Sequence, residues 1–133
     1  MKDNLFKRLE AMVAGADSIL LVGHAHPDQD AIGSVLAFRS YLSHLGKKVS
    51  CYTPDSAPEY VSFMSGSEDL GADPSIFDRR WDLIIFLDCA SVDRAGLTQQ
   101  DLVGKLTAVI DHHISNPGFA SLNLIDPRAS STC

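Results

Sequence analysis

Histidines and aspartates follow three apolar stretches of this sequence. The run ILLVG is closely followed by two histidines and two aspartates: His24, His26, Asp28 and Asp30. The run LIIFL ends at Asp88, and the run TAVI ends at a group of three: Asp111, His112 and His113. Imidazole and carboxylate groups bind divalent metal ions and transfer protons in catalysis. These three places are therefore the candidates for chemistry in this chain.

Short apolar runs of this kind are typical of strands that are covered on both faces of a sheet. They alternate with segments of helical periodicity, which indicates an α/β protein. We expect strands at 18–23, 47–53, 81–88, 107–111 and, nearer an edge, 121–126. We expect helices at 4–15 and 31–46, a short helix or turn at 100–106, and one or two short helices between 54 and 80. The predicted fold is a single three-layer α/β domain, with a mostly parallel sheet and helices on both faces.

The carboxyl ends of parallel strands share one edge of the sheet, and ligands bind there. The three groups should therefore converge on one crevice. Several aspartates in one site repel one another, and Arg94 is the single nearby candidate for neutralising them, so a divalent cation is the better solution. Two cations that share one carboxylate would suit phosphoryl hydrolysis, because such a pair activates water and binds the attacking and leaving oxygens.

Composition restricts the partners and the compartment. The formal net charge is -6, so we expect no large nucleic-acid surface, although a small phosphate substrate is compatible with a metal site. The cysteines are Cys51, Cys89 and Cys133, an odd number without a CxxC motif, which favours a reduced, cytoplasmic protein. The first residues are amphipathic rather than signal-like, and no apolar run approaches the ~20 residues of a membrane span. We therefore predict no membrane partner.

The segments HAHPDQDAIGS, FLD and DHH, in this order and each behind an apolar run, resemble the DHH phosphoesterase superfamily. Residues 111–133 resemble the branch of nanoRNases that also act on 3'-phosphoadenosine 5'-phosphate (pAp). The resemblance implies a parallel sheet with flanking helices and Mn2+ as the usual metal, with Mg2+ or Co2+ as alternatives. It also implies a small phosphate-containing substrate or a short oligonucleotide as the partner.

The resemblance assigns roles to the motif residues. One metal ion would be held by three residues: His24, Asp28 and Asp88. The second ion would be held by three residues: Asp30, Asp88 and His112. Asp88 would therefore bridge the two ions. Asp111 and His113 would complete the catalytic set with Asp88, by orienting ligands or by facing the substrate.

His26, Ser34 and Arg94 are the predicted substrate-binding residues. His26 stands where the family often has asparagine, so we expect it to face the substrate. Gly33 and Ser34 begin the helix 31–46, and they either bring its N-terminus near a phosphate or only allow close packing on the sheet. Arg94 is either a phosphate clamp or a surface residue.

Asp30 and Asp88 also have ordinary structural interpretations. Aspartate is a common N-cap residue, and Asp30 could cap the helix through one oxygen while it binds a metal through the other. Asp88 could be a turn residue at the end of a strand. The joint pattern of the three motifs favours ligation for both.

The chain ends at Cys133, before a fourth motif in which the family supplies one more aspartate to the second metal. It also lacks the family's C-terminal DHH-associated domain, and ASSTC resembles the N-cap of a helix. We therefore expect residues 1–133 to be a DHH catalytic domain that is incomplete at its C-terminus. Such a piece should bind at most one divalent ion tightly, hydrolyse very little, and self-associate through exposed apolar surface.

Three functions are compatible with these features. The first is a two-metal phosphoesterase that hydrolyses short oligoribonucleotides or pAp. The second is a manganese pyrophosphatase or exopolyphosphatase with the same centre. The third is a non-catalytic nucleotide-binding module. Turnover by the full-length protein separates the first two from the third, and the substrate profile separates the first from the second.

Overall fold

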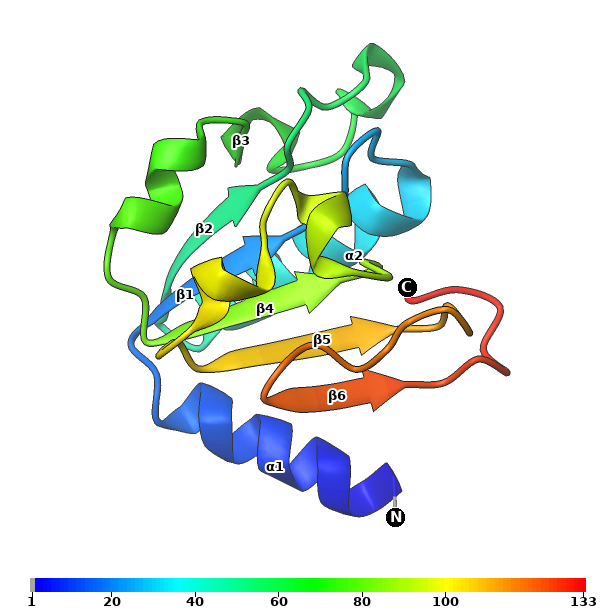
Figure 1. The fold of residues 1–133 in the computed structure, drawn as a ribbon. Helices are drawn as coiled ribbons and strands as arrows, with labels where there is room; N and C mark the ends of the chain where they lie inside the picture. Colours follow the sequence, from blue (N-terminus) through cyan, green and yellow to red (C-terminus); the bar gives the residue numbers. More distant parts are fainter. Residues whose placement is uncertain (1) are drawn as a thin grey trace.

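Six parallel strands form the central sheet of this protein. The computed structural model describes residues 2–133. Along the sheet the strands follow the order β3-β2-β1-β4-β5-β6 (Figure 1). Their bounds are β1 Ser18–Val22, β2 Lys48–Tyr52, β3 Leu70–Gly71, β4 Leu83–Leu87, β5 Thr107–Asp111 and β6 Leu122–Ile125. All neighbouring strands pair in parallel, so their carboxyl ends lie along one edge.

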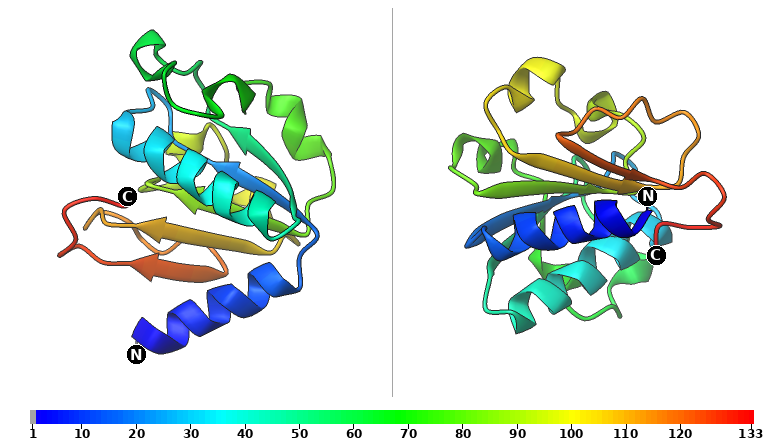
Figure 2. Two further views of the ribbon diagram at one scale, coloured as in Figure 1. Left: turned by 180° about the vertical axis from the view of Figure 1, so that it is seen from behind. Right: turned by 90° about the horizontal axis from the view of Figure 1, so that it is seen from below.

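Two α-helices pack on one face of the sheet, and the 3-10 helices in the ranges 74–78, 92–95 and 99–102 cover the other. The α-helices are α1 Lys2–Ala14 and α2 Gln29–His44. The 3-10 helices are η1 Glu59–Val61, η2 Ser67–Asp69, η3 Pro74–Asp78, η4 Val92–Ala95 and η5 Gln99–Leu102. The right-hand view of Figure 2 shows α1 and α2 together on one side of the sheet, with the segment of η4 and η5 on the other. None of the helices described for residues 2–133 has the length and hydrophobicity that a membrane span requires.

The strand order explains why both faces are covered. From the central pair β1 and β4, strands β2 and β3 lie to one side, and β5 and β6 lie to the other. Crossovers between parallel strands are right-handed, so connections that run in opposite directions along the sheet lie on opposite faces. The direction reverses between β1 and β4, and in open α/β sheets ligands bind outside the carboxyl ends of the strands at such a point. The HAHPDQD segment follows β1, and Asp88 follows β4, so both lie at this point.

Side chains of the central strands alternate between two apolar cores. Ile19 and Leu21 of β1 pack in the core that includes α1 and α2. Leu20 and Val22 pack in the core that includes residues of η3, η4 and η5. Every residue of β4 is buried. Burial of a leucine or isoleucine side chain contributes about 1.5–3 kcal/mol, and coverage of both faces explains why these strands are continuous apolar runs in the sequence.

The sequence predicts this architecture, and the differences lie at its margins. The strands β1, β2, β4, β5 and β6 fall within the predicted ranges, and β6 is at an edge. The sheet is wholly rather than mostly parallel. Strand β3 was not predicted, because its two residues carry no apolar run. The 3-10 helix η4 was not predicted either. The segment 54–80 holds three 3-10 helices, where one or two short helices were expected. Helices this short show no periodicity in the sequence.

A partly open groove lies on the α-helical face, beside α1 and the carboxyl ends of β5 and β6. Its apolar lining consists of Leu5, Phe6, Ile110, Leu124, Ile125 and Ala129. The side chain of Phe6 is 55% exposed. Self-association through exposed apolar surface remains a prediction.

Candidate metal centre

The first histidine follows a close approach between two backbones. Gly23 donates its N–H to the Tyr52 carbonyl at 2.9 Å, and a Cβ at Gly23 would lie 2.9 Å from the methyl carbon of Thr53. A residue larger than glycine would require a shift here. The next residue, His24, is 6% exposed, and its Nδ1 lies 2.6 Å from the Ala25 carbonyl oxygen. Nδ1 must carry the proton of this bond, which leaves the lone pair on Nε2.

Asp28 caps α2 and also faces His24. Its Oδ1 accepts the N–H of Ala31 at 2.9 Å, which is the bond of an N-cap residue. The same oxygen lies 3.8 Å from His24 Nε2. The interpretation of Asp30 as the N-cap is therefore wrong, because α2 begins one residue after Asp28 and Asp30 lies in its first turn.

Asp30 is bonded to the far end of the chain. Its Oδ2 accepts the N–H of Thr132 at 3.0 Å, and its Oδ1 accepts the N–H of Cys133 at 2.8 Å. The Ser34 hydroxyl lies 3.4 Å from Oδ1. Burial pushes the pKa of Asp30 up, but the backbone donors of Thr132 and Cys133 outweigh it and hold this pKa below its ordinary value. Asp30 is therefore held as a carboxylate at the start of α2.

Asp88 lies at the centre of the cluster. It is 1% exposed and has a left-handed backbone φ of 58°. Such a φ costs a non-glycine residue about 1 kcal/mol, so the surrounding fold must hold Asp88 in place. Its Oδ2 lies 3.6 Å from His24 Nε2, and its Oδ1 lies 3.4 Å from His112 Nε2. The neighbouring Asp88 carboxylate raises the pKa of His24, against the opposing effect of burial.

The DHH segment begins at the last residue of β5, where Asp111 is 4% exposed. Its Oδ1 accepts the N–H of His112 at 2.8 Å and lies 2.6 Å from His113 Nδ1. Its Oδ2 accepts a proton of the Asn116 side-chain amide at 2.8 Å. Asp111 is thus occupied by hydrogen bonds that orient its neighbours.

The two histidines of this segment have different surroundings. His112 Nδ1 lies 3.2 Å from the Ala129 carbonyl oxygen, which again leaves a lone pair on Nε2. That nitrogen lies 3.5 Å from Asp30 Oδ2, in addition to its contact with Asp88. His113 Nδ1 is bonded to Asp111 and lies 3.9 Å from Asp88 Oδ1. The His113 side chain is 41% exposed, so it lies at the rim of the cluster.

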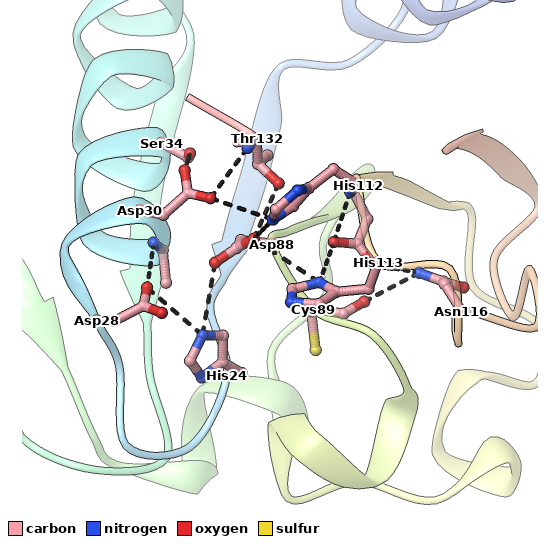
Figure 3. Close-up of polar contacts among 12 residues, drawn as sticks. His24, Asp28, Asp30, Ser34, Asp88, Cys89, His112, His113, Asn116 and Thr132 are labelled. Carbon is pink, nitrogen blue, oxygen red and sulfur yellow. Dashed lines mark hydrogen bonds and ion pairs between the residues drawn. The ribbon is translucent and has the colours of Figure 1, made fainter. Parts of the chain in front are cut away.

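These side chains form two overlapping groups whose donor atoms are close enough to hold divalent metal ions (Figure 3). The groups are His24, Asp28 and Asp88, and Asp88, Asp111, His112 and His113. Within each group, one candidate ligand atom per residue lies within 4.8 Å of the others. The donors are oxygen and imidazole nitrogen without thiolate, and the Nε2 lone pairs of His24 and His112 face the carboxylates. This donor set fits Mn2+, Mg2+, Fe2+ or Co2+.

The three predicted substrate-binding residues lie in different places. The His26 side chain is 95% exposed, and its backbone N–H donates to Asp55 Oδ2 at 2.7 Å. Ser34 is 6% exposed and faces Asp30 instead of open solvent. The Arg94 side chain is exposed, and its main-chain carbonyl accepts the N–H of Ala25 at 2.6 Å. Their contact with a substrate remains a prediction.

The sequence analysis missed three residues that hold the site together. Thr132 donates its hydroxyl to Asp88 Oδ1 at 2.9 Å. Asn116 bridges Asp111 and the Cys89 carbonyl, at 2.8 and 3.1 Å. Asp55 fixes the backbone of the HAHPDQD loop. Thr132 lies in ASSTC, where the sequence indicated only a helix cap. Nothing in the local sequence around Asn116 or Asp55 indicated their contacts.

Known proteins resemble this chain in the same region. The sequence profile of the DHH family, N-terminal domain, matches residues 18–133. The bifunctional oligoribonuclease and PAP phosphatase NrnA of Thermus thermophilus is 32% identical over 124 residues, which cover 92% of this chain and 36% of the relative. The probable bifunctional oligoribonuclease and PAP phosphatase NrnA of Streptococcus mutans is 29% identical over 127 residues, which cover 95% of this chain and 39% of the relative.

A solved structure has the same fold. The crystal structure of an exopolyphosphatase-related protein from Bacteroides fragilis is 27% identical, with a TM-score of 0.86, and the match covers 98% of this chain and 41% of that one. The chain therefore spans less than half the length of each of these relatives. Because the family profile extends over most of the chain and includes all three motifs, this protein belongs to the DHH family and matches its N-terminal domain.

Proposed function

We propose that this chain carries the metal centre of a phosphoesterase that hydrolyses short oligoribonucleotides or pAp. The observation that supports this function most strongly is the position of Asp88. Its two oxygens face His24 and His112 at 3.6 and 3.4 Å, from the two sides of one carboxylate. A shared carboxylate of this kind suits a pair of divalent ions that act on a phosphoryl group.

Two ligand sets would hold the ions. The first set is His24, Asp28 and Asp88. The second set is Asp30, Asp88 and His112. We propose Mn2+ for both positions, with Mg2+ or Co2+ as alternatives, because the donors are carboxylate and imidazole. When bound, such ions activate water and neutralise the charge of the phosphoryl oxygens.

The chain itself supplies a proton site next to these sets. Asp111 holds the proton of His113 on Nδ1 through the contact of 2.6 Å, so Nε2 is the nitrogen that can exchange a proton with a substrate. The ring of His113 is partly exposed, so a phosphate ester can reach it. We assign to His113 the donation of a proton to the leaving oxygen as the P–O bond breaks. Asp111 stabilises the charged imidazole in that step.

Substrate contacts are assigned from exposure. His26 is the best candidate, because its ring is almost fully exposed while its backbone is fixed by Asp55. Arg94 is exposed near the same loop and would bind a phosphate through its guanidinium. Ser34 is better placed to support Asp30 than to reach a ligand directly.

The candidate substrates are taken from the names of the related proteins. Two of them are described as oligoribonuclease and PAP phosphatase. The structural relative is described as exopolyphosphatase-related, and this supports polyphosphate as the second candidate substrate. A non-catalytic nucleotide-binding module is the third candidate, because the chain spans less than half of each relative.

Product formation in the presence of Mn2+ tests these candidates: inorganic phosphate is measured for pAp and polyphosphate, and mononucleotides are measured for a ribodinucleotide. The substrates are pAp, a ribodinucleotide and polyphosphate, and the assay uses both this chain and the longer protein that we expect to contain it. We expect the longer protein to hydrolyse pAp and the dinucleotide, and this chain alone to hydrolyse very little. A preference for polyphosphate would support the second candidate. Nucleotide binding without turnover by the longer protein would support the third, and robust turnover by residues 1–133 would show that they are sufficient.

A further inference from the structure

The last residues of the chain contact one of the two ligand sets. Residues 129–133 form a segment that we name the strap, and Thr132 of this strap lies beside Asp30 and Asp88 (Figure 3). The backbone N–H groups of Thr132 and Cys133 donate to the two oxygens of Asp30 at 3.0 and 2.8 Å. The Thr132 hydroxyl donates to Asp88 at 2.9 Å. The strap therefore supplies hydrogen-bond donors to two adjacent carboxylates.

The strap also fixes a histidine. The carbonyl oxygen of Ala129 lies 3.2 Å from His112 Nδ1 and keeps its proton on that nitrogen. With this contact, every member of the second set is bonded to the strap. Within residues 2–133, the bonds that fix His24 and Asp28 come instead from their own loop and from the first turn of α2.

The strap contacts one particular oxygen atom of Asp88. Thr132 donates to Oδ1, the oxygen that faces His112 at 3.4 Å. Oδ2, at 3.6 Å from His24, belongs to the other half of the centre. A carboxylate oxygen has two lone pairs, so Oδ1 can accept the hydroxyl proton and still bind a metal ion.

We propose that the strap positions the second ligand set, and that Thr132 is its positioning residue. The proposal rests on the proposed function, because it assumes that both sets bind metal ions. The Thr132 hydroxyl holds Asp88 Oδ1 in the direction of His112, while the backbone donors hold Asp30. Loss of one hydrogen-bond partner behind a ligand weakens metal binding by about 10–100-fold. The loss should affect the second set and spare the first.

Three variants test the proposal. Thr132→Val removes the hydroxyl and keeps the shape of the side chain. Thr132→Ser keeps the hydroxyl and serves as the rescue. Ser131→Ala is the matched control, because Ser131 lies in the strap and its side chain has no hydrogen bond to Asp30 or Asp88 among the described residues. Thermal unfolding without metal verifies that each variant is folded.

Two measurements report on the two sets separately. Calorimetric titration with Mn2+ gives the affinities of a tight and a weak class of sites. Titration with Zn2+, a diamagnetic substitute, is followed by the imidazole 15N signals and tells whether His24 or His112 responds. In Thr132→Val, we expect the weak class to lose about 10-fold or more in affinity and the His112 response to move to higher Zn2+, with His24 unchanged. Thr132→Ser and Ser131→Ala should behave like the original chain.

Other outcomes would overturn the proposal. If Thr132→Val bound the second ion as well as the original chain or more tightly, the hydroxyl would not position the set. If both classes weakened equally, or if Thr132→Ser behaved like Thr132→Val, the strap would have only a structural role. If the original chain showed no metal response at either histidine, the proposed function would fail as well, and the strap would have nothing to position.

Discussion

The two halves of the centre are built in different ways. In the first set, the orienting bonds are local: Asp28 accepts the N–H of Ala31, and the Nδ1–H of His24 points to the next carbonyl. In the second set, Asp30 is bonded to residues 102 and 103 positions later in the chain. The first half can be positioned by one loop and one helix start. The second half requires the chain to return across the sheet.

This difference has a consequence for stability as well as for binding. Local bonds form as soon as β1 and α2 are in place, whereas the strap must be ordered at a cost of about 1–2 kcal/mol per residue. The second set should therefore be the more easily disturbed half. Asp88 belongs to both halves, so it provides the most severe test of the comparison.

Substitution of Asp88 should have the largest effect, because Asp88 belongs to both proposed ligand sets. We expect Asp88→Ala to weaken Mn2+ binding at both positions by more than about 100-fold, beyond the loss of an outer hydrogen-bond partner, and to abolish hydrolysis in the longer protein. The fold should be retained, because loss of carboxylate repulsion offsets loss of the hydrogen bond from Thr132. Calorimetry and phosphate release measure the two effects.

Asp88→Asn is the matched control for the backbone. Asparagine tolerates the left-handed φ of 58° better than alanine does, so any loss of stability that is confined to Asp88→Ala reports on that backbone. Both variants should lose the metal ions. Near-normal turnover of either variant at saturating Mn2+ would contradict the bridging role.

Asp28→Asn and Asp30→Asn should separate the two halves. Asparagine caps a helix as well as aspartate does, so Asp28→Asn should leave the stability of α2 within about 0.5 kcal/mol and weaken only the first set. Asp30→Asn should weaken only the second set. Titration with Mn2+ and urea unfolding give the affinities and the stabilities. Equal weakening of both classes of sites by Asp30→Asn would argue against two separable halves.

The pH dependence of the metal-free chain should show the smallest effect, with opposite signs in the two halves. The pKa of His24 is raised above 6.5, so its contribution to stability is present below 6.5 and is lost as the pH rises through the raised pKa. The pKa of Asp30 is lowered below 3.8, so its contribution is present above 3.8 and is lost as the pH falls through the lowered pKa.

Urea unfolding of His24→Gln and Asp30→Asn beside the original chain measures this effect. The stability difference caused by His24→Gln should shrink as the pH rises above 6.5, and that caused by Asp30→Asn should shrink as the pH falls below 3.8. A His24→Gln difference that grew with rising pH would contradict the Asp88 carboxylate as the cause of the raised pKa. His44, on α2 and far in sequence from the ligands, provides a control through His44→Gln.

The sequence alone was sufficient for the sheet and for the membership of the cluster. Strands covered on both faces require continuous apolar runs, and parallel strands place their carboxyl ends on one edge. These two facts were enough to predict that His24, Asp28, Asp30, Asp88 and His112 would come together, and the structure brings them together. The short 3-10 helices and the two-residue β3 were beyond this reasoning, because they lack a period or an apolar run.

Only the tertiary structure decided which atoms hold the cluster. It made Asp28 rather than Asp30 the N-cap of α2, and it placed Thr132 against Asp88, 44 residues away in sequence. It also brought Asn116 to Asp111 and the Cys89 carbonyl. Periodicity and motif spacing describe neighbours along the chain, whereas these hydrogen bonds join segments that meet only when the sheet is complete. The sequence therefore determined which residues form this cluster, and the fold determined their orientation.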